Sequence, residues 1–164
     1  MANEAAIHSN PPGDTIWRPD ATVATIVERD GRFLFVEERV RGRLVLNQPA
    51  GHLEPRESLV DAAARETLEE TGWVVRPHCL VGIYQWTSPD DGAAVLRFAF
   101  GAEVVEQRTG AVLDHGIERV LWLARDELES RRAQARSPLV ARSVDDWLAG
   151  RRIPLEALQC VASE

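Results

Sequence analysis

The sequence has 164 residues, of which 45% are apolar and 27% charged, and its formal net charge is −7. These values are ordinary for one soluble globular domain with its own core, and they exclude wholesale disorder. The acidic balance also excludes the broad basic surface with which proteins hold nucleic-acid backbones. An acidic protein can still bind phosphate if its carboxylates gather around a divalent cation, because the ion reverses the local field.

The N-terminal composition and the cysteines indicate neither export nor a membrane anchor. Residues 1–17 lack the basic region and apolar run of a signal peptide, and no apolar stretch approaches the ~20 residues of a membrane span. Cys79 and Cys160 form no disulfide framework and no metal-binding spacing. We therefore expect a cytoplasmic monomer or homodimer, with no membrane partner and no nucleic-acid polymer partner.

The first predicted elements follow a polar arm, residues 1–19, which we expect to be flexible. Apolar, β-branched runs separated by turn residues are typical of strands. Asp30 and Gly31 form such a turn, so the first two strands should make a hairpin. The strands predicted in this part of the chain lie at residues 21–28, 32–38 and 44–49.

A helix is predicted over residues 58–71, after a loop at 51–56. Ser58 is a suitable N-cap with Asp61 three residues on, and Gly72 is suited to end the helix. Further strands are predicted at residues 79–86, 93–105 and 119–123, and further helices from about residue 125 and over about 137–150. The expected architecture is one α/β (α+β) domain with a mixed sheet at residues 20–157, followed by a tail at 158–164.

Three carboxylates share one face of the helix predicted at 58–71. Glu66 and Glu70 are i,i+4 neighbours, and Glu69 lies three residues after Glu66. Like charges at this spacing destabilise an isolated helix, and Arg65 can offset part of the repulsion because it is four residues from both Asp61 and Glu69. Two interpretations stay open at this point: a solvated helix face, or a site for Mg²⁺, which prefers carboxylate oxygens. The face expected to pack on the sheet contains Val60, Ala63, Ala64, Thr67 and Thr71.

The segment from Gly51 to Trp73 resembles the signature of Nudix hydrolases, G-x5-E-x7-R-E-U-x-E-E-x-G-U, in which U is apolar. All seven fixed residues are present at the required intervals: Gly51, Glu57, Arg65, Glu66, Glu69, Glu70 and Gly72. Thr67 and Trp73 are mild departures at the apolar positions, on the packing side of the helix. The resemblance implies an α/β/α sandwich around a mixed sheet and hydrolysis of a phosphoanhydride.

The resemblance also implies a metal site and its ligands. Glu66, Glu69 and Glu70 would bind Mg²⁺, for which Mn²⁺ can substitute, and the carbonyl of Gly51 would be a further ligand. Arg65 would orient a glutamate rather than touch the substrate. Two residues of the signature would be structural: Glu57, which would tie the loop to the helix, and Gly72.

A carboxylate is also needed to take the proton from the attacking water. We assign this role to Glu66, with Arg65 and Glu69 as further members of the catalytic set. Glu118 is the fallback for the base, since several Nudix enzymes take another acid from a loop after the signature, as base or as metal ligand. Glu118 is the first candidate for that acid and Asp114 the second, and an exposed acid without a catalytic role is the alternative for each.

Candidates for contacts with the substrate lie around the signature. Trp86 would stack on a ring, or pack at the edge of the sheet. Gln48 would contact a base edge, or be only the polar end of a strand. Arg97 would face a phosphate, or pair with a surface acid. His52, in the signature loop, would approach a phosphate or face solvent.

The segments that flank the signature resemble the phosphatase-type members of the Nudix family over about residues 20–157. This resemblance implies release of orthophosphate from nucleoside di- and triphosphates and from hydroxymethylpyrimidine pyrophosphate. The alternatives are a Nudix hydrolase of nucleoside diphosphate sugars or dinucleotides, an isopentenyl diphosphate isomerase, and a non-catalytic nucleotide-binding protein. An isomerase would need a cysteine in the site, and the complete acid cluster argues against a non-catalytic protein. The flanking segments are residues 47–54, 84–91, 96–100 and 136–156.

Overall fold

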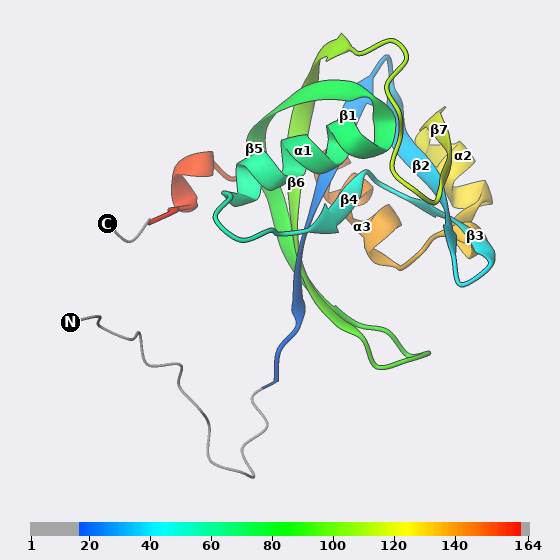
Figure 1. Ribbon diagram of the computed structural model, residues 1–164, viewed down its shortest axis with the longest axis horizontal. Coiled ribbons are helices and arrows are strands. Elements are labelled where there is room, and N and C mark those ends of the chain that lie inside the picture. The colour runs from blue at the N-terminus through cyan, green and yellow to red at the C-terminus, as the bar shows by residue number, and fades with distance from the viewer. Residues whose placement is uncertain (1–16, 162–164) are drawn as a thin grey trace.

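Seven strands in residues 17–161, the part of the chain that this computed structural model describes, form one mixed sheet (Figure 1). The strands are β1 (Asp20–Arg29), β2 (Arg32–Val40), β3 (Arg43–Asn47), β4 (Ala50–His52), β5 (Trp73–Thr87), β6 (Ala94–Gln107) and β7 (Ile117–Leu123). The helices are α1 (Leu59–Thr71), α2 (Arg125–Ser130) and α3 (Leu139–Leu148), with short 3₁₀ turns at Arg132–Gln134 and Leu155–Ala157. No helix in this described part of the chain has the length and apolar composition needed to cross a membrane.

The sheet divides along β1. The strand order is β3-β2-β1-β6-β5, β7 pairs with β2, and only the β1–β6 pair is parallel. The first half of β1 pairs with β4, through Thr22–Ala24, whereas its last residues, Glu28 and Arg29, pair with β2. The strands β2 and β3 therefore diverge from the start of β1 and leave room for a cavity between the two halves of the sheet.

Buried side chains alternate between the two faces of the sheet, as the two-residue period of a strand requires. The cluster beside α1 contains Val23, Ala62, Ala63, Leu80 and Phe100. The cluster beside α2 and α3 contains Ile26, Phe33, Phe35, Leu46, Val81, Ala99, Leu123, Leu128, Val140 and Val144. Figure 1 shows α1 in front of the sheet and α3 behind it. The mixed sheet with helices on both faces confirms the predicted fold class.

Helix α1 begins and ends where the sequence predicts. The N–H of Asp61 donates to Ser58 Oγ at 3.1 Å, and Gly72 ends the helix in the left-handed conformation, with φ of 72°. The buried side differs from the prediction, because Ala62 is buried and Ala64 only half-buried. Two of the acids are also on this side: the buried residues of α1 are Ala62, Ala63, Glu66, Thr67, Glu70 and Thr71.

The other boundaries follow from strand pairing. The short β4 replaces the start of the predicted loop because residues 50–52 pair with β1. The strand β5 begins six residues before the predicted start, because Trp73 and the residues after it pair with the end of β6. The predicted arm, residues 1–19, and the tail, residues 158–164, lie partly outside the described residues, so these boundaries stay predictions.

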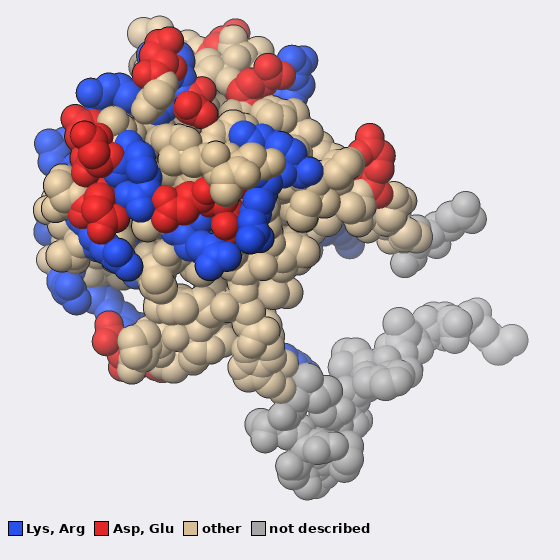
Figure 2. Space-filling model, turned by 180° about the vertical axis from the view of Figure 1, so that it is seen from behind, with Lys and Arg blue, Asp and Glu red and all other residues tan. Residues whose placement is uncertain are grey.

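Acidic and basic side chains are interspersed on the face opposite the view of Figure 1 (Figure 2). On α2 and α3, Arg125 pairs with Asp145 at 2.5 Å and with Glu129 at 3.0 Å, and Arg142 pairs with Asp146 at 2.9 Å. Neighbouring acids thus neutralise part of the positive charge of the arginines in these helices.

Candidate active site

A cavity of about 710 Å³ opens where the sheet divides. Its walls come from the first residues of β1, the turn between β2 and β3, β4, the acidic side of α1, the tip of the β5–β6 hairpin, and the residues just before α3. Volumes of 300–1,000 Å³ are typical of sites for small molecules. The cavity brings the signature segment together with strands and loops far from it in the sequence.

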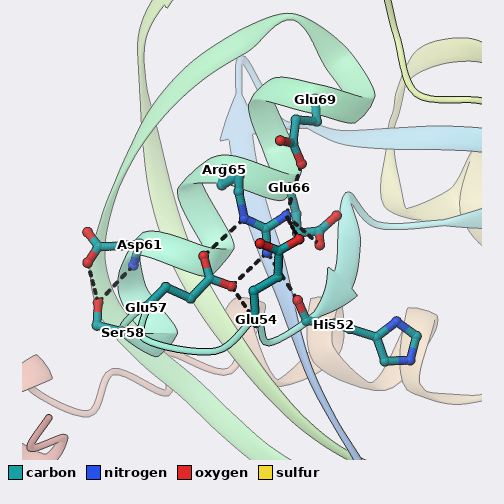
Figure 3. Close-up of polar contacts among 8 residues, drawn as sticks. All are labelled: His52, Glu54, Glu57, Ser58, Asp61, Arg65, Glu66 and Glu69. Carbon is teal, nitrogen blue, oxygen red and sulfur yellow. Dashed lines mark hydrogen bonds and ion pairs between the residues drawn. The ribbon is translucent and has the colours of Figure 1, made fainter.

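Arg65 joins the signature loop to the helix (Figure 3). Its Nε and Nη2 donate to the two oxygens of Glu57 at 3.0 and 2.7 Å, and Nη2 also donates to the carbonyl of His52 at 3.1 Å. Its Nη1 donates to Glu66 Oε1 and Glu69 Oε2, each at 2.9 Å. The hydrogen bonds from Arg65 hold the pKa of Glu57 below its usual range. One guanidinium thus fixes three carboxylates and the loop backbone relative to one another.

Asp61 contacts the N-cap residue Ser58 and not Arg65, the partner expected from the helical spacing. Asp61 Oδ2 accepts a hydrogen bond from Ser58 Oγ at 2.6 Å (Figure 3). The N-cap serine competes for this carboxylate because the two residues meet in the first turn of α1.

Three carboxylates converge beside α1. One oxygen each from Glu66, Glu69 and Asp114 lies within 4.8 Å of the others. Asp114 comes from the loop between β6 and β7, and its backbone N–H donates to the carbonyl of Glu69 at 3.0 Å. Burial raises the pKa of Glu66 despite its bond to Arg65, and Glu69 and Asp114 add to the rise. Closely spaced oxygens whose charges repel one another fit a hard divalent cation.

Gly51, Glu66 and Glu70 line the acidic end of the cavity, whereas the other two carboxylates of the cluster are not among its lining residues. A Cβ atom placed on Gly51 would lie 2.1 Å from Glu66 Cδ, so the backbone can approach this carboxylate only at a glycine. Glu70 Oε2 accepts a hydrogen bond from the N–H of Ala50 at 2.9 Å, next to Gly51. Burial is the main cause that raises the pKa of Glu70 to about 8, and Glu38 and Glu66 add to it.

The β5–β6 hairpin forms the wall that carries Trp86. Trp86 pairs with Val95, is half-buried and lines the cavity. Arg97 lies two residues further along β6, also lines the cavity, and is only 7% exposed. At the mouth, Arg41 pairs with Asp91 at 2.8 Å and so joins the β2–β3 turn to the β5–β6 turn.

Gln48 does not line the cavity. It is 1% exposed, and its Nε2 donates to the carbonyl of Val140 at 2.7 Å and to Ser143 Oγ at 3.0 Å. The neighbouring residue, Asn47, lines the cavity instead. Successive side chains of an extended segment point to opposite sides, which separates the two amides.

Glu118 is not brought to the acid cluster either. It lies on β7, is exposed, and accepts a hydrogen bond from Arg39 Nε at 2.9 Å. The second candidate of the pair, Asp114, is the one that meets Glu66 and Glu69. His52 lines the cavity but is exposed, with its Nε2 3.9 Å from Asp20 Oδ2.

The polar residues that line the cavity and that sequence reasoning missed include Arg41, Asn47, Arg136 and Ser137. Strand alternation carried a signal for Asn47, since it and Gln48 could not both face one side. No local pattern indicates the other three, because their positions depend on how the β2–β3 turn and the start of α3 meet the rest of the sheet.

The comparison with protein families decides the classification. The model of the NUDIX domain matches residues 17–143, which include the whole Arg65 network and Asp114. The chain belongs to the Nudix family. As a Nudix hydrolase it acts on phosphoanhydrides, as the signature predicts.

Relatives of this Nudix hydrolase extend over most of the chain. It is 41% identical over 143 residues to phosphatase NudJ from Escherichia coli strain K12 and from Shigella boydii serotype 4, with 87% of this chain and 92% of each relative covered. The structure of a Nudix hydrolase from Nitrosomonas europaea is 46% identical, with a TM-score of 0.86 and coverage of 88% of this chain and 98% of the other. These similarities confirm the predicted family, and NudJ is a relative of the phosphatase type.

Proposed function

We propose that this Nudix hydrolase is a Mg²⁺-dependent phosphatase of nucleoside di- and triphosphates and of hydroxymethylpyrimidine pyrophosphate, with orthophosphate as a product. One observation carries the proposal: a single cavity is lined by the acids Glu66 and Glu70, the aromatic Trp86 and the buried cation Arg97. Similarity to NudJ, named a phosphatase, supports orthophosphate as the product.

The proposed metal site uses the acids beside α1. Glu66, Glu69 and Asp114 would hold the ion, with Glu70 and the carbonyl of Gly51 as the further ligands expected from the signature. When bound, Mg²⁺ or Mn²⁺ would neutralise phosphate charge and favour departure of the bridging oxygen.

Glu66 is the proposed acceptor of the proton from the attacking water. Burial raises the pKa of Glu66, which makes its carboxylate a stronger base. Arg65 would act as a positioning residue, since it binds Glu66 and Glu69 through the same nitrogen. Asp114 replaces Glu118 as the second candidate for the base, because Asp114 shares the cluster with Glu66.

The ring of the substrate would contact the hairpin wall, and phosphate oxygens would also reach the inner end of the cavity. Trp86 would stack on the ring of a nucleobase or pyrimidine, a contact that tolerates different rings. Arg97 would bind phosphate oxygens by charge-assisted hydrogen bonds. Together these contacts suit a substrate with an aromatic ring at one end and phosphate at the other.

The competing functions differ in features of the site. An isomerase with a cysteine in its site is disfavoured, because neither Cys79 nor Cys160 is among the described residues that line the cavity. A binding protein without catalysis would not need Glu66, Glu69 and Asp114 to converge. Hydrolysis of nucleotide sugars or dinucleotides would use the same acids and is distinguished by its substrate and products.

The decisive experiment is a product analysis over a panel of substrates. We expect ATP, GTP, ADP and hydroxymethylpyrimidine pyrophosphate to yield orthophosphate and the shortened ester with Mg²⁺ or Mn²⁺, and no turnover in excess EDTA. Glu69→Gln and Glu70→Gln should each lower kcat by orders of magnitude at an unchanged circular dichroism spectrum. Turnover that persists in EDTA would contradict the metal role, and pyrophosphate plus a monophosphate from ATP would contradict the phosphatase type.

A further inference from the structure

Arg97 is a buried cation at the inner end of the cavity. Along β6, Val95 and Arg97 line the cavity, and the next residue on the same face, Ala99, is fully buried in the core. Within residues 17–161, the guanidinium makes one hydrogen bond, from Nη1 to the amide oxygen of Asn47 at 3.3 Å, and its Nε has no partner. A buried charge with so little hydrogen bonding is costly, which favours an anionic ligand at this position.

Arg136 adds a second guanidinium to the same place. Its backbone N–H donates to the carbonyl of Leu46 at 2.9 Å, which fixes it beside the end of β3. Its side chain pairs with Glu38 at 2.6 Å, and Glu38 also accepts from Asn47 Nδ2 at 3.1 Å. Burial, followed by the charge of Arg136, lowers the pKa of Arg97 to about 10. Glu38 thus balances the charge of only one of these two arginines. Glu70 is the other acid whose charge raises the pKa of Arg97.

Ser137 and the start of α3 lie next to these arginines. Ser137 is 8% exposed and lines the cavity, and its Oγ accepts a hydrogen bond from the N–H of Leu139 at 3.3 Å. Its hydroxyl proton can therefore be directed to an acceptor in the cavity. The positive end of the α3 dipole adds a favourable field for an anion.

We propose that Arg97, Arg136 and Ser137 form a subsite for the terminal phosphate of the substrate, separate from the acids that would hold the metal. The substrate class follows from burial. Arg97, Ser137 and Asn47 are buried, with 7, 8 and 2% of their surfaces exposed, so we place the end of the bound substrate against them. The subsite accepts a phosphate with a free end and disfavours compounds whose phosphates are covered on both sides, such as ADP-ribose and dinucleoside polyphosphates. The assignment of a substrate phosphate rests on the proposed function, whereas anion binding at these residues does not.

The test measures binding of inorganic orthophosphate without added metal. The full chain in EDTA is titrated with phosphate by isothermal calorimetry, and we expect saturable binding. Arg136→Gln and Arg97→Lys should each weaken it about tenfold or more, since each removes or misplaces charge-assisted hydrogen bonds. Arg76→Gln is the matched control, because Arg76 is exposed and pairs with Glu103 outside the cavity. Thermal unfolding checks the fold, and Arg136, whose side chain is 43% exposed, gives a usable variant if Arg97→Lys is unstable.

The outcomes separate this subsite from the proposed reaction. Absence of phosphate binding by the wild type, or equal binding by Arg136→Gln, Arg97→Lys and Arg76→Gln, overturns the subsite. In the active enzyme, Arg136→Gln should lower kcat/KM for ATP about tenfold while leaving any turnover of ADP-ribose nearly unchanged. Equal losses on both compounds contradict the role in selecting a free terminal phosphate. Failure of the whole substrate panel with phosphate binding intact would reject the proposed function and leave the anion subsite standing.

Discussion

Gly51 touches the carboxylate of Glu66 so closely that a side chain has no room between them. A Cβ atom on Gly51 would lie 2.1 Å from Cδ and 2.2 Å from both oxygens of Glu66. The absence of a side chain at Gly51 therefore leaves the space that this carboxylate occupies, even though the backbone of Gly51 is not in a conformation that requires glycine.

Gly51→Ala should displace Glu66 and weaken binding of Mn²⁺ about tenfold or more, the size of effect usual when a ligand's support is changed. Titration followed by electron paramagnetic resonance measures this affinity. Gly150→Ala is the control, because a Cβ there meets no atom within 4 Å although its φ of 81° is strained for alanine. Equal metal affinity in Gly51→Ala and the wild type would contradict the role of Gly51 in positioning Glu66 for the ion.

Glu70 should make the metal-free protein less stable as the pH rises. Its pKa is about 8 in the folded protein, against an ordinary value of 4.5, so the folded state binds more protons than the unfolded state between these values. The free energy of unfolding should therefore fall, relative to Glu70→Gln, from about pH 5 to pH 8 and change little above that. Urea denaturation in EDTA at several pH values measures it. If the free energy of unfolding has the same pH dependence in the wild type and in Glu70→Gln, the raised pKa of Glu70 is contradicted.

Asp114 and Glu118 should differ sharply as catalytic acids. Asp114→Asn removes one of the three converging carboxylates and should weaken metal binding about tenfold or more, with a loss of kcat. Glu118→Gln breaks only an exposed pair with Arg39 and should leave kcat within about twofold. Steady-state kinetics at several Mg²⁺ concentrations compares them. If Glu118→Gln loses more kcat than Asp114→Asn, Glu118 and not Asp114 is the catalytic acid.

Trp86 should matter only for substrates that have a ring. Trp86→Ala should lower kcat/KM about tenfold or more for nucleotides, because stacking on an aromatic side chain is worth ~1–3 kcal/mol. Inorganic tripolyphosphate, which has no ring, is the control substrate, and Trp86→Phe should recover much of the loss. Equal losses on ringed and ringless substrates would indicate that Trp86 supports the fold.

Gln48 should contribute to stability and not to substrate binding. Gln48→Ala removes both hydrogen bonds to α3 and leaves the carbonyl of Val140 without this partner, at a cost of about 1–3 kcal/mol. The midpoint of thermal unfolding should fall by several degrees. The kcat/KM should stay within about twofold, because Gln48 does not line the cavity. A selective loss of kcat/KM at unchanged stability would restore the base-contact hypothesis.

Local sequence was sufficient to determine the centre of the acidic site. The helix has its N-cap at Ser58 and its end at Gly72 because both signals act within one or two turns. Helical spacing then brings Arg65, Glu66 and Glu69 to neighbouring positions wherever the helix lies. The same segment supplies Gly51, whose missing side chain is a property of the sequence alone.

Only the tertiary structure decided what surrounds that segment. Asp114, and not Glu118, meets Glu66 because a backbone hydrogen bond fixes the β6–β7 loop against α1. Arg136 lies near Arg97 because the segment just before α3 pairs with the end of β3, and nothing in the 38 intervening residues (98–135) encodes that arrangement locally. Such contacts depend on strand order and register, which arise from burial of side chains distributed over the whole sheet.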